Sequence, residues 1–110
     1  MKMKNTLSDI QKKHAHSAQI GSLFLDSEKR SAYYGGEEIR LTESEFSIIF
    51  KLLSDSGSVF TRAQLAEEIK SANNRTVDIH IAKLRSKFVE CDDFDIITVH
   101  GKGYKAKIYI

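Results

Sequence analysis

The chain has 110 residues, of which 41% are hydrophobic and 29% are charged. These proportions are those of a soluble globule, argue against disorder, and at this length allow one domain built on a single core. The net charge of +2 is too small to indicate a nucleic-acid partner by itself, so the positions of the charges must decide that question.

The cysteine count and the hydropathy pattern indicate in which cellular compartment the protein is expected. The one cysteine, Cys91, excludes an internal disulfide and a paired-cysteine metal site, and it fits a reducing compartment. No stretch approaches about 18 consecutive apolar residues, and no apolar segment follows the lysines at the N-terminus. We therefore expect a cytoplasmic protein with no membrane partner.

Residues 1–18 are polar, with Leu7 and Ile10 as their main apolar anchors, and we expect a flexible tail or linker with some helical tendency. The folded domain is expected over residues 19–110. His14 and His16 have a spacing that a metal could bridge, but no third ligand accompanies them, so we expect no metal site.

A small antiparallel sheet is predicted before the first helix. Residues 20–26 alternate weakly and are typical of a short strand. Residues 30–34 and 37–41 flank two consecutive glycines, whose freedom to adopt positive φ angles favours a tight hairpin turn. Tyr33 and Tyr34 should point to opposite faces of their strand, one into the core and one to the surface.

Two capping boxes predict where the first two helices begin. In the first, Thr42 can accept a hydrogen bond from the amide of Glu45, whose carboxylate reaches back to the amide of Thr42. Thr61 and Gln64 repeat this arrangement at the start of a shorter helix, and Gly57 fits a left-handed cap between the two. Apolar residues at three- and four-residue steps should face the core: Phe46, Ile49, Phe50, Leu53, Leu65 and Ile69.

Residues 73–88, NNRTVDIHIAKLRSKF, predict an amphipathic third helix. At about 100° per residue, its bulky apolar side chains fall in one stripe, made of Val77, Ile81, Leu84 and Phe88. The opposite side carries Arg75, Thr76, Ile79, Lys83, Ser86 and Lys87. Between residues 70 and 87, five basic side chains stand against one acid, Asp78. Such a face suits a nucleic-acid groove, where cations bind phosphates and methyl groups contact thymine, but a solvated face on a structural helix has a similar composition.

The C-terminal residues predict a β-hairpin. Residues 96–99 are β-branched, residues 100–103 form a turn, and residues 104–110 alternate strictly, with Tyr104, Ala106, Ile108 and Ile110 on one face. Lys102 lies between two glycines at the tip, where a flexible backbone can approach a phosphate or a minor groove. A short helix, a polar turn, a basic helix and this hairpin together indicate a winged helix-turn-helix.

The runs RTVDIHIAKLRSKF at residues 75–88 and TVHGKGY at residues 98–104 strongly resemble the OmpR/PhoB-type winged-helix DNA-binding domain of bacterial response regulators. The resemblance extends through VFTRAQL at residues 59–65 and IRLTESEF at residues 39–46, and it covers about residues 19–109. It implies an α+β fold with a four-stranded N-terminal antiparallel sheet, three helices and a C-terminal β-hairpin wing. The recognition helix, about residues 74–88, would enter the major groove of double-stranded DNA, and the wing, about residues 98–107, would lie near the minor groove.

The resemblance also implies DNA contacts at matching positions of this chain. Recognition-helix positions that touch phosphates or base edges are matched by Arg75, Thr76, His80, Lys83 and Arg85, and wing positions by Thr98, His100 and Tyr104. The residue pattern itself adds Ile79, Lys87 and Lys102. The helical projection places Arg85 on a flank, which favours a phosphate contact or a structural ion pair over base readout. Ala82 and His100 stand where the family often has a basic residue, and this loss should flatten the salt dependence of binding.

The resemblance implies a transcription regulator that binds specific DNA sequences as a head-to-tail pair on tandem half-sites, and it leaves a contact with RNA polymerase open. Family members usually carry a receiver domain, for which about 18 leading residues are too short. The rival interpretation is a winged helix that contacts only proteins. We expect no enzyme and no cofactor, because the sequence has no serine elbow and no loop long enough to cradle a nucleotide.

Overall fold

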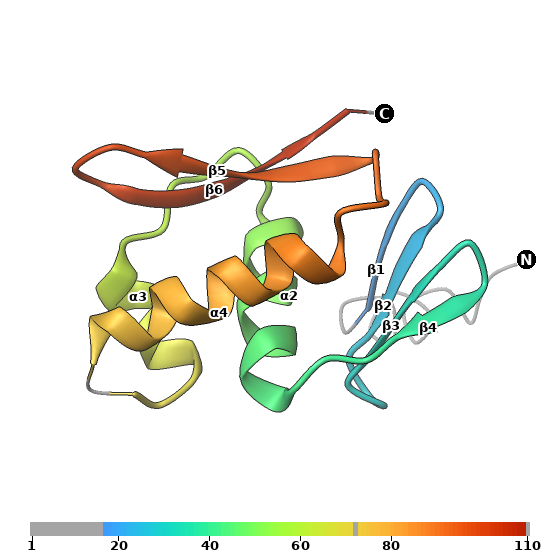
Figure 1. The fold of residues 1–110 in the computed structure, drawn as a ribbon, viewed down its shortest axis with the longest axis horizontal. Helices are drawn as coiled ribbons and strands as arrows, with labels where there is room; N and C mark the ends of the chain where they lie inside the picture. The colour runs from blue at the N-terminus through green and yellow to red at the C-terminus, as the bar shows by residue number, and fades with distance from the viewer. Residues whose placement is uncertain (1–16, 72, 110) are drawn as a thin grey trace, which may run out of the picture.

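The computed structural model of the chain describes residues 17–71 and 73–109 (Figure 1). A four-stranded sheet comes first, formed by β1 (Ser17–Ile20), β2 (Leu23–Asp26), β3 (Ser31–Tyr34) and β4 (Glu37–Ile39). Three helices and a two-stranded hairpin follow, namely α2 (Glu43–Ser54), α3 (Arg62–Glu68), α4 (Asn74–Lys87), β5 (Phe94–Val99) and β6 (Gly103–Ile108). This α+β arrangement is the predicted winged helix-turn-helix.

The N-terminal sheet is antiparallel throughout, with its strands in chain order. The single strand predicted over residues 20–26 was wrong, because the chain turns at Gly21, whose φ is +58°, and so forms two strands. β1 already begins at Ser17, within the tail predicted for residues 1–18, whereas His14 and His16 lie outside the described residues. The glycine hairpin between β3 and β4 and the opposite facing of the two tyrosines are confirmed: Tyr34 packs on the core, and Tyr33 stacks on Phe24.

The core lies where α2 and α4 cross and where the sheet and the hairpin close over them (Figure 1). All four members of the predicted α4 stripe are buried: Val77, Ile81, Leu84 and Phe88. Each such side chain contributes about 1.5 to 3 kcal/mol when it leaves water, which is why the opposite face of α4 must be the solvent face.

The start of each helix is fixed by local hydrogen bonds. Both predicted capping boxes are present, with Thr42 Oγ1 accepting from the Glu45 amide at 3.2 Å and Thr61 Oγ1 accepting from the Gln64 amide at 3.0 Å. Asn73 caps α4, and its Oδ1 accepts from the Arg75 amide at 2.8 Å. These caps satisfy amides that have no partner within their own helix.

The hairpin packs beside α4 and α3. β5 begins at Phe94, earlier than the predicted residue 96, because the buried Phe94 ring packs edge-on against Phe88 with centroids 5.4 Å apart. In β6, the Tyr104 backbone exchanges hydrogen bonds of 2.8 and 2.9 Å with Phe60, just before α3. A Cβ at Gly103 would lie 2.0 Å from the Phe60 carbonyl oxygen, so this close approach requires glycine. Ile110, predicted on the inner face, lies outside the described residues.

Candidate nucleic-acid interface

The solvent face of α4 presents two cations with an apolar side chain between them. Arg75, Lys83, Ala82 and Ser86 are exposed, and Ile79 keeps 50% of its surface in water. Thr76 is half-buried beside them. Within the described residues, neither the Arg75 guanidinium nor the Lys83 ammonium makes a hydrogen bond or an ion pair. Both charges are therefore available to an external partner.

Two other predicted contact residues of α4, both exposed, also make hydrogen bonds within the protein. Arg85 donates to the Ile96 carbonyl at 2.7 Å and to Thr98 Oγ1 at 2.9 Å, which ties α4 to β5 without an ion pair. Lys87 donates to Glu45 Oε1 at 2.5 Å and to the Arg40 carbonyl at 2.9 Å. These two cations hold the C-terminal half of α4 in place.

The carboxylate of Glu45 is almost fully buried, with 1% of the residue exposed. Burial opposes its charged form and by itself would raise its pKa. The hydrogen bonds from Lys87 and from the Thr42 amide outweigh burial, and the net pKa of Glu45 is lowered. The charged pair of Glu45 and Lys87 therefore persists at neutral pH and fastens α4 to the start of α2.

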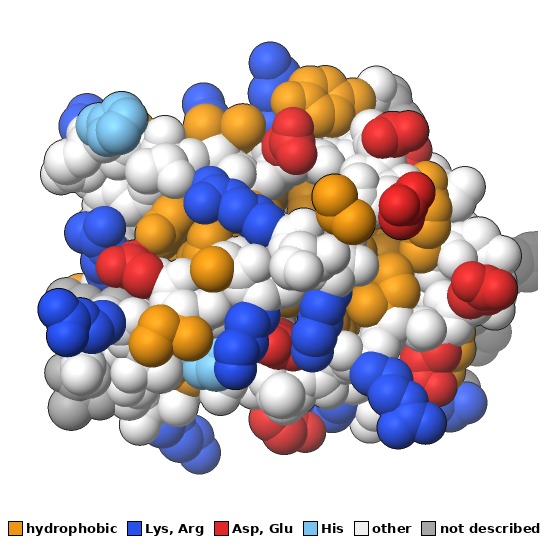
Figure 2. Space-filling view, in the orientation of Figure 1, with side chains coloured by type: hydrophobic (Ala, Val, Ile, Leu, Met, Phe, Trp, Pro, Cys, Tyr) orange, Lys and Arg blue, Asp and Glu red, His pale blue; other side chains and the backbone are white. Residues whose placement is uncertain are grey.

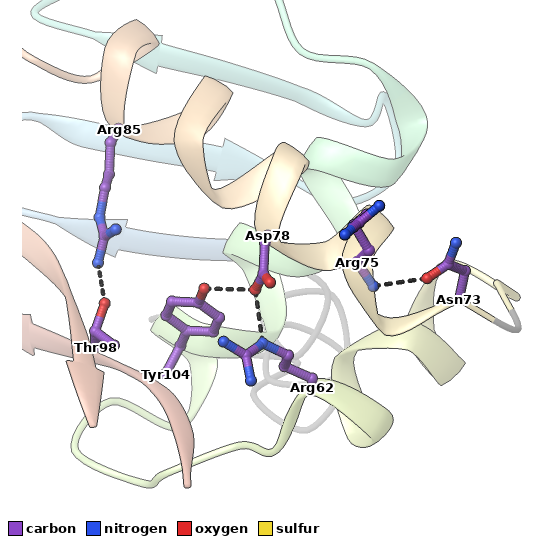
Figure 3. Close-up of polar contacts among 7 residues, drawn as sticks. All are labelled: Arg62, Asn73, Arg75, Asp78, Arg85, Thr98 and Tyr104. Carbon is purple, nitrogen blue, oxygen red and sulfur yellow. Dashed lines mark hydrogen bonds and ion pairs between the residues drawn. The ribbon is translucent and has the colours of Figure 1, made fainter. Parts of the chain in front are cut away.

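Tyr104 of β6 was predicted to lie near the DNA backbone, but its ring is buried where the hairpin meets α4. Its hydroxyl donates to Asp78 Oδ1 at 2.6 Å, and Arg62 Nε donates to the same oxygen at 2.8 Å (Figure 3). The hydrogen bond from Tyr104 and that from Arg62 lower the pKa of Asp78, against the opposing effect of burial. Burial, followed by the bond to Asp78, raises the pKa of Tyr104.

Sequence reasoning missed this cluster of Arg62, Asp78 and Tyr104. One signal was present, because Asp78 is the only acid among the basic residues of the helix. A lone carboxylate in such a segment indicates a specific partner, although the sequence does not say that the partners come from α3 and β6.

His80 occupies a different position from Arg75 and Lys83. The residue is half-buried, and its Nδ1 is buried with no hydrogen-bond partner among the described residues. Because Nδ1 is buried, the other ring nitrogen, Nε2, is the one left to make the predicted contact of His80.

The tip of the hairpin carries the remaining predicted residues. Thr98, His100 and Lys102 are exposed, and the Lys102 amide donates to the Val99 carbonyl at 2.9 Å to close the turn. Figure 2 shows basic side chains along α4 and, on the same face, a histidine and further basic side chains at the hairpin turn in the upper left. Most acidic side chains on this face lie toward the opposite end (Figure 2).

A cleft of about 400 Å³ lies between the C-terminal end of α4 and the base of the hairpin, with Arg85 among its lining residues. Its floor includes Leu84, Phe88 and Phe94, and buried Cys91 lines it. Burial raises the pKa of the Cys91 thiol, which keeps the thiol protonated at neutral pH. Across residues 17–71 and 73–109, no three His, Cys, Asp or Glu residues group as a metal site, and no helix there is long and apolar enough to cross a membrane.

The family described as "Transcriptional regulatory protein, C terminal" matches residues 36–106. The chain belongs to this family. The fold and the resemblance to OmpR/PhoB-type domains expected from the sequence are thus confirmed.

Curated relatives of this regulatory domain are themselves transcriptional regulators by name. The probable transcriptional regulator ycf27 of Cyanophora paradoxa is 39% identical over 99 residues, a stretch that covers 83% of this chain and 41% of the relative. The transcriptional regulatory protein VxrB of Vibrio cholerae is 38% identical over 90 residues, which cover 78% of this chain and 36% of VxrB. The chain thus spans about two fifths of the length of the curated relatives it matches.

Solved structures show the same fold. The DNA-binding domain of response regulator AdeR, in complex with an intercistronic region, has a TM-score of 0.74 and 32% identity, covering 84% of this chain and 100% of that domain. The Klebsiella pneumoniae RstA DNA-binding domain, in complex with the RstA box, has a TM-score of 0.70 and 28% identity, covering 81% of this chain and 94% of that one.

Proposed function

We propose that this domain binds double-stranded DNA in a sequence-specific manner as part of a transcription regulator. In this proposal α4 enters the major groove, and the wing, about residues 98–107, lies near the adjacent minor groove. The observation that carries it is the α4 face on which Arg75 and Lys83 are exposed, with no side-chain partner among the described residues, beside half-exposed Ile79. The AdeR and RstA domains, whose structures are complexes with an intercistronic region and with the RstA box, support it.

The predicted residues take three roles in this proposal. Arg75 and Lys83 are the principal groove contacts, and Thr76, Ile79 and His80 contribute methyl groups and a ring nitrogen. Lys102 contacts phosphates from the wing tip, with His100 and Thr98 beside it. Because their polar groups are bonded within the protein, Arg85, Lys87 and Tyr104 act chiefly by holding α4 and the wing in place.

The rival function is a winged helix that contacts only proteins, with its basic face on an acidic partner. Ile79, half-exposed between Arg75 and Lys83, matches the mixture of phosphates, base edges and thymine methyl groups in a major groove. DNA is therefore the better explanation of this face.

The proposal extends to the assembly and the setting of the domain. We expect a head-to-tail pair on tandem half-sites, a regulatory rather than catalytic role, and a cytoplasmic location, which the single cysteine also fits. A contact with RNA polymerase through the short polar loop between α3 and α4 stays a prediction.

A selection from randomised duplexes at two salt concentrations tests the proposal, because phosphate contacts lose affinity with salt whereas base contacts set the enriched sequence. We expect enrichment of a tandem motif. On the selected duplex, Lys83→Ala should weaken binding by about 1 to 3 kcal/mol if Lys83 reads a base, and should change the preferred base at one position. Lys102→Ala should weaken all sequences alike.

Lys29→Ala is the matched control, because Lys29 is an exposed lysine in the turn between β2 and β3, away from the proposed interface. It should leave affinity nearly unchanged. No binding to any duplex at low salt would favour the protein-contact function. A loss for Lys29→Ala equal to that for Lys83→Ala would mean that α4 is not the contact surface.

A further inference from the structure

The carboxylate of Asp78 joins three elements at one oxygen atom. Asp78 projects from α4, and its Oδ1 accepts from Tyr104 of β6 at 2.6 Å and from Arg62 of α3 at 2.8 Å (Figure 3). The Tyr104 ring also lies between two guanidinium groups, 6.0 Å from Arg62 Cζ and 5.7 Å from Arg85 Cζ. The Tyr104 side chain is therefore held by a hydrogen bond at its hydroxyl and by two guanidinium groups next to its aromatic ring.

This arrangement is better suited to fixing geometry than to adding stability. The Asp78 and Arg62 side chains retain 40% and 51% of their surface in water, and ion pairs so exposed contribute little to the free energy of unfolding. The hydrogen bond from buried Tyr104 to a charged acceptor is short and directional. Asp78 thus fixes where the Tyr104 side chain lies relative to α4.

The position of Tyr104 determines the position of the wing tip. Tyr104 follows Gly103 and lies two residues from Lys102, a separation of about 7 Å along an extended chain. The turn between β5 and β6 contains Gly101, whose φ is +75°, and it is closed by the hydrogen bond from the Lys102 amide to the Val99 carbonyl. The Phe60 backbone holds β6 to the segment before α3, and Arg85 holds β5 to α4. The bond from Tyr104 to Asp78 is the contact that joins α4 directly to the strand that leads to Lys102.

We propose that Asp78 is a positioning residue that holds the wing at the angle to α4 at which both can contact one duplex. The inference rests on the proposed DNA-binding function. Asp78 touches no DNA in this account, and its anionic charge is masked by Arg62 and Tyr104. Its effect on binding is transmitted through Tyr104 to Lys102.

A double-mutant cycle on the duplex selected above tests this inference, with affinities measured by fluorescence anisotropy. Lys102→Ala is introduced into the wild-type chain and into the Tyr104→Phe, Asp78→Ala and Asp78→Asn chains. Tyr104→Phe keeps the ring and removes only the hydroxyl. Asp78→Asn keeps an acceptor oxygen where both donors point, whereas Asp78→Ala removes it.

We expect Lys102→Ala to weaken binding about fivefold in the wild-type chain, the scale of one charged contact, and less than about twofold with Tyr104→Phe or Asp78→Ala. With Asp78→Asn, the effect of Lys102→Ala should return toward its wild-type size. Lys83→Ala is the control substitution, because Lys83 lies on α4 itself, and its effect should be the same in every chain.

The outcomes separate the inference from the function on which it rests. An equal loss from Lys102→Ala in all four chains, or no loss in the wild-type chain, would overturn the positioning role while DNA binding stands. If the effect of Lys83→Ala also disappears with Tyr104→Phe, Tyr104 supports the whole domain rather than the wing, and the inference fails. A wild-type chain that binds no duplex would overturn the proposed function first.

Discussion

Replacing Lys87 by alanine should destabilise the domain much more than its place on a basic surface helix suggests. The substitution leaves the Glu45 carboxylate buried, and among the described residues the Thr42 amide is the one donor that remains, at 2.9 Å. Removing one partner from a fully buried ion pair costs about 3 to 5 kcal/mol, and because the Lys87 side chain is 34% exposed we reduce this to about 2 kcal/mol. For a domain of this size, this loss corresponds to a drop in Tm of about 10 °C.

The loss should depend on pH in a defined direction. In the wild-type chain the folded pKa of Glu45 lies below its ordinary value of 4.5, so its stabilising contribution is complete above that pH and is lost as the pH falls through the folded value. In Lys87→Ala, burial dominates and the folded pKa rises above 4.5. The penalty is then present at pH 7 and is relieved as the pH falls and the carboxyl takes up a proton. The stability difference between the two chains should therefore shrink on acidification.

Urea unfolding at pH 7 and at pH 4.5 measures both effects, and two further variants sharpen the result. Lys51→Ala is the matched control, because Lys51 pairs with Glu68 at 3.6 Å where both side chains are well exposed, and it should cost less than about 0.5 kcal/mol. Adding Glu45→Gln to Lys87→Ala should recover about 1 kcal/mol, because the amide oxygen can still accept from Thr42 without a buried charge. Equal losses for Lys87→Ala and Lys51→Ala at pH 7 would refute the reasoning.

Two further pairs of substitutions have expected outcomes. Gly103→Ala should destabilise the wing by more than about 2 kcal/mol, because its Cβ would lie 2.0 Å from the Phe60 carbonyl, whereas Gly101→Ala, with φ of +75° and open space around it, should cost only about 1 kcal/mol. Thermal unfolding of the pair checks this, and equal shifts would contradict it. Thr42→Ala should cost about 1 kcal/mol in urea unfolding through loss of its cap, and Thr42→Ser should cost less than half of that.

The elements that the sequence predicted well are those set by local rules. Val77 and Leu84 repeat at helical spacing, and the capping boxes at Thr42 and Thr61 join residues only three positions apart. Such local patterns favour the same secondary structure whatever the rest of the fold is. The break at Gly21 was missed because a glycine followed by a serine within an apolar run is only a weak turn signal.

The roles of the basic residues were harder to predict because their partners are distant in the sequence. Lys87 and its carboxylate are separated by 42 residues, and Tyr104 and Asp78 by 26. Helical projection places a cation on the outer face but cannot show whether a buried carboxylate from another element meets it. For the same reason, the sequence does not indicate that the Asp93 carboxylate accepts from the Ser22 amide, 71 positions away, at 3.0 Å.

The bond from Arg85 to the Ile96 carbonyl also protects an exposed strand edge. Within residues 17–71 and 73–109, β5 pairs with β6 on one side only, and backbone groups on an unpaired edge are templates for a strand from another molecule. The guanidinium fills the Ile96 acceptor and lies across the neighbouring Thr98 hydroxyl, which obstructs such self-pairing. Molecules crowded together at high concentration should therefore resist aggregation through their hairpins.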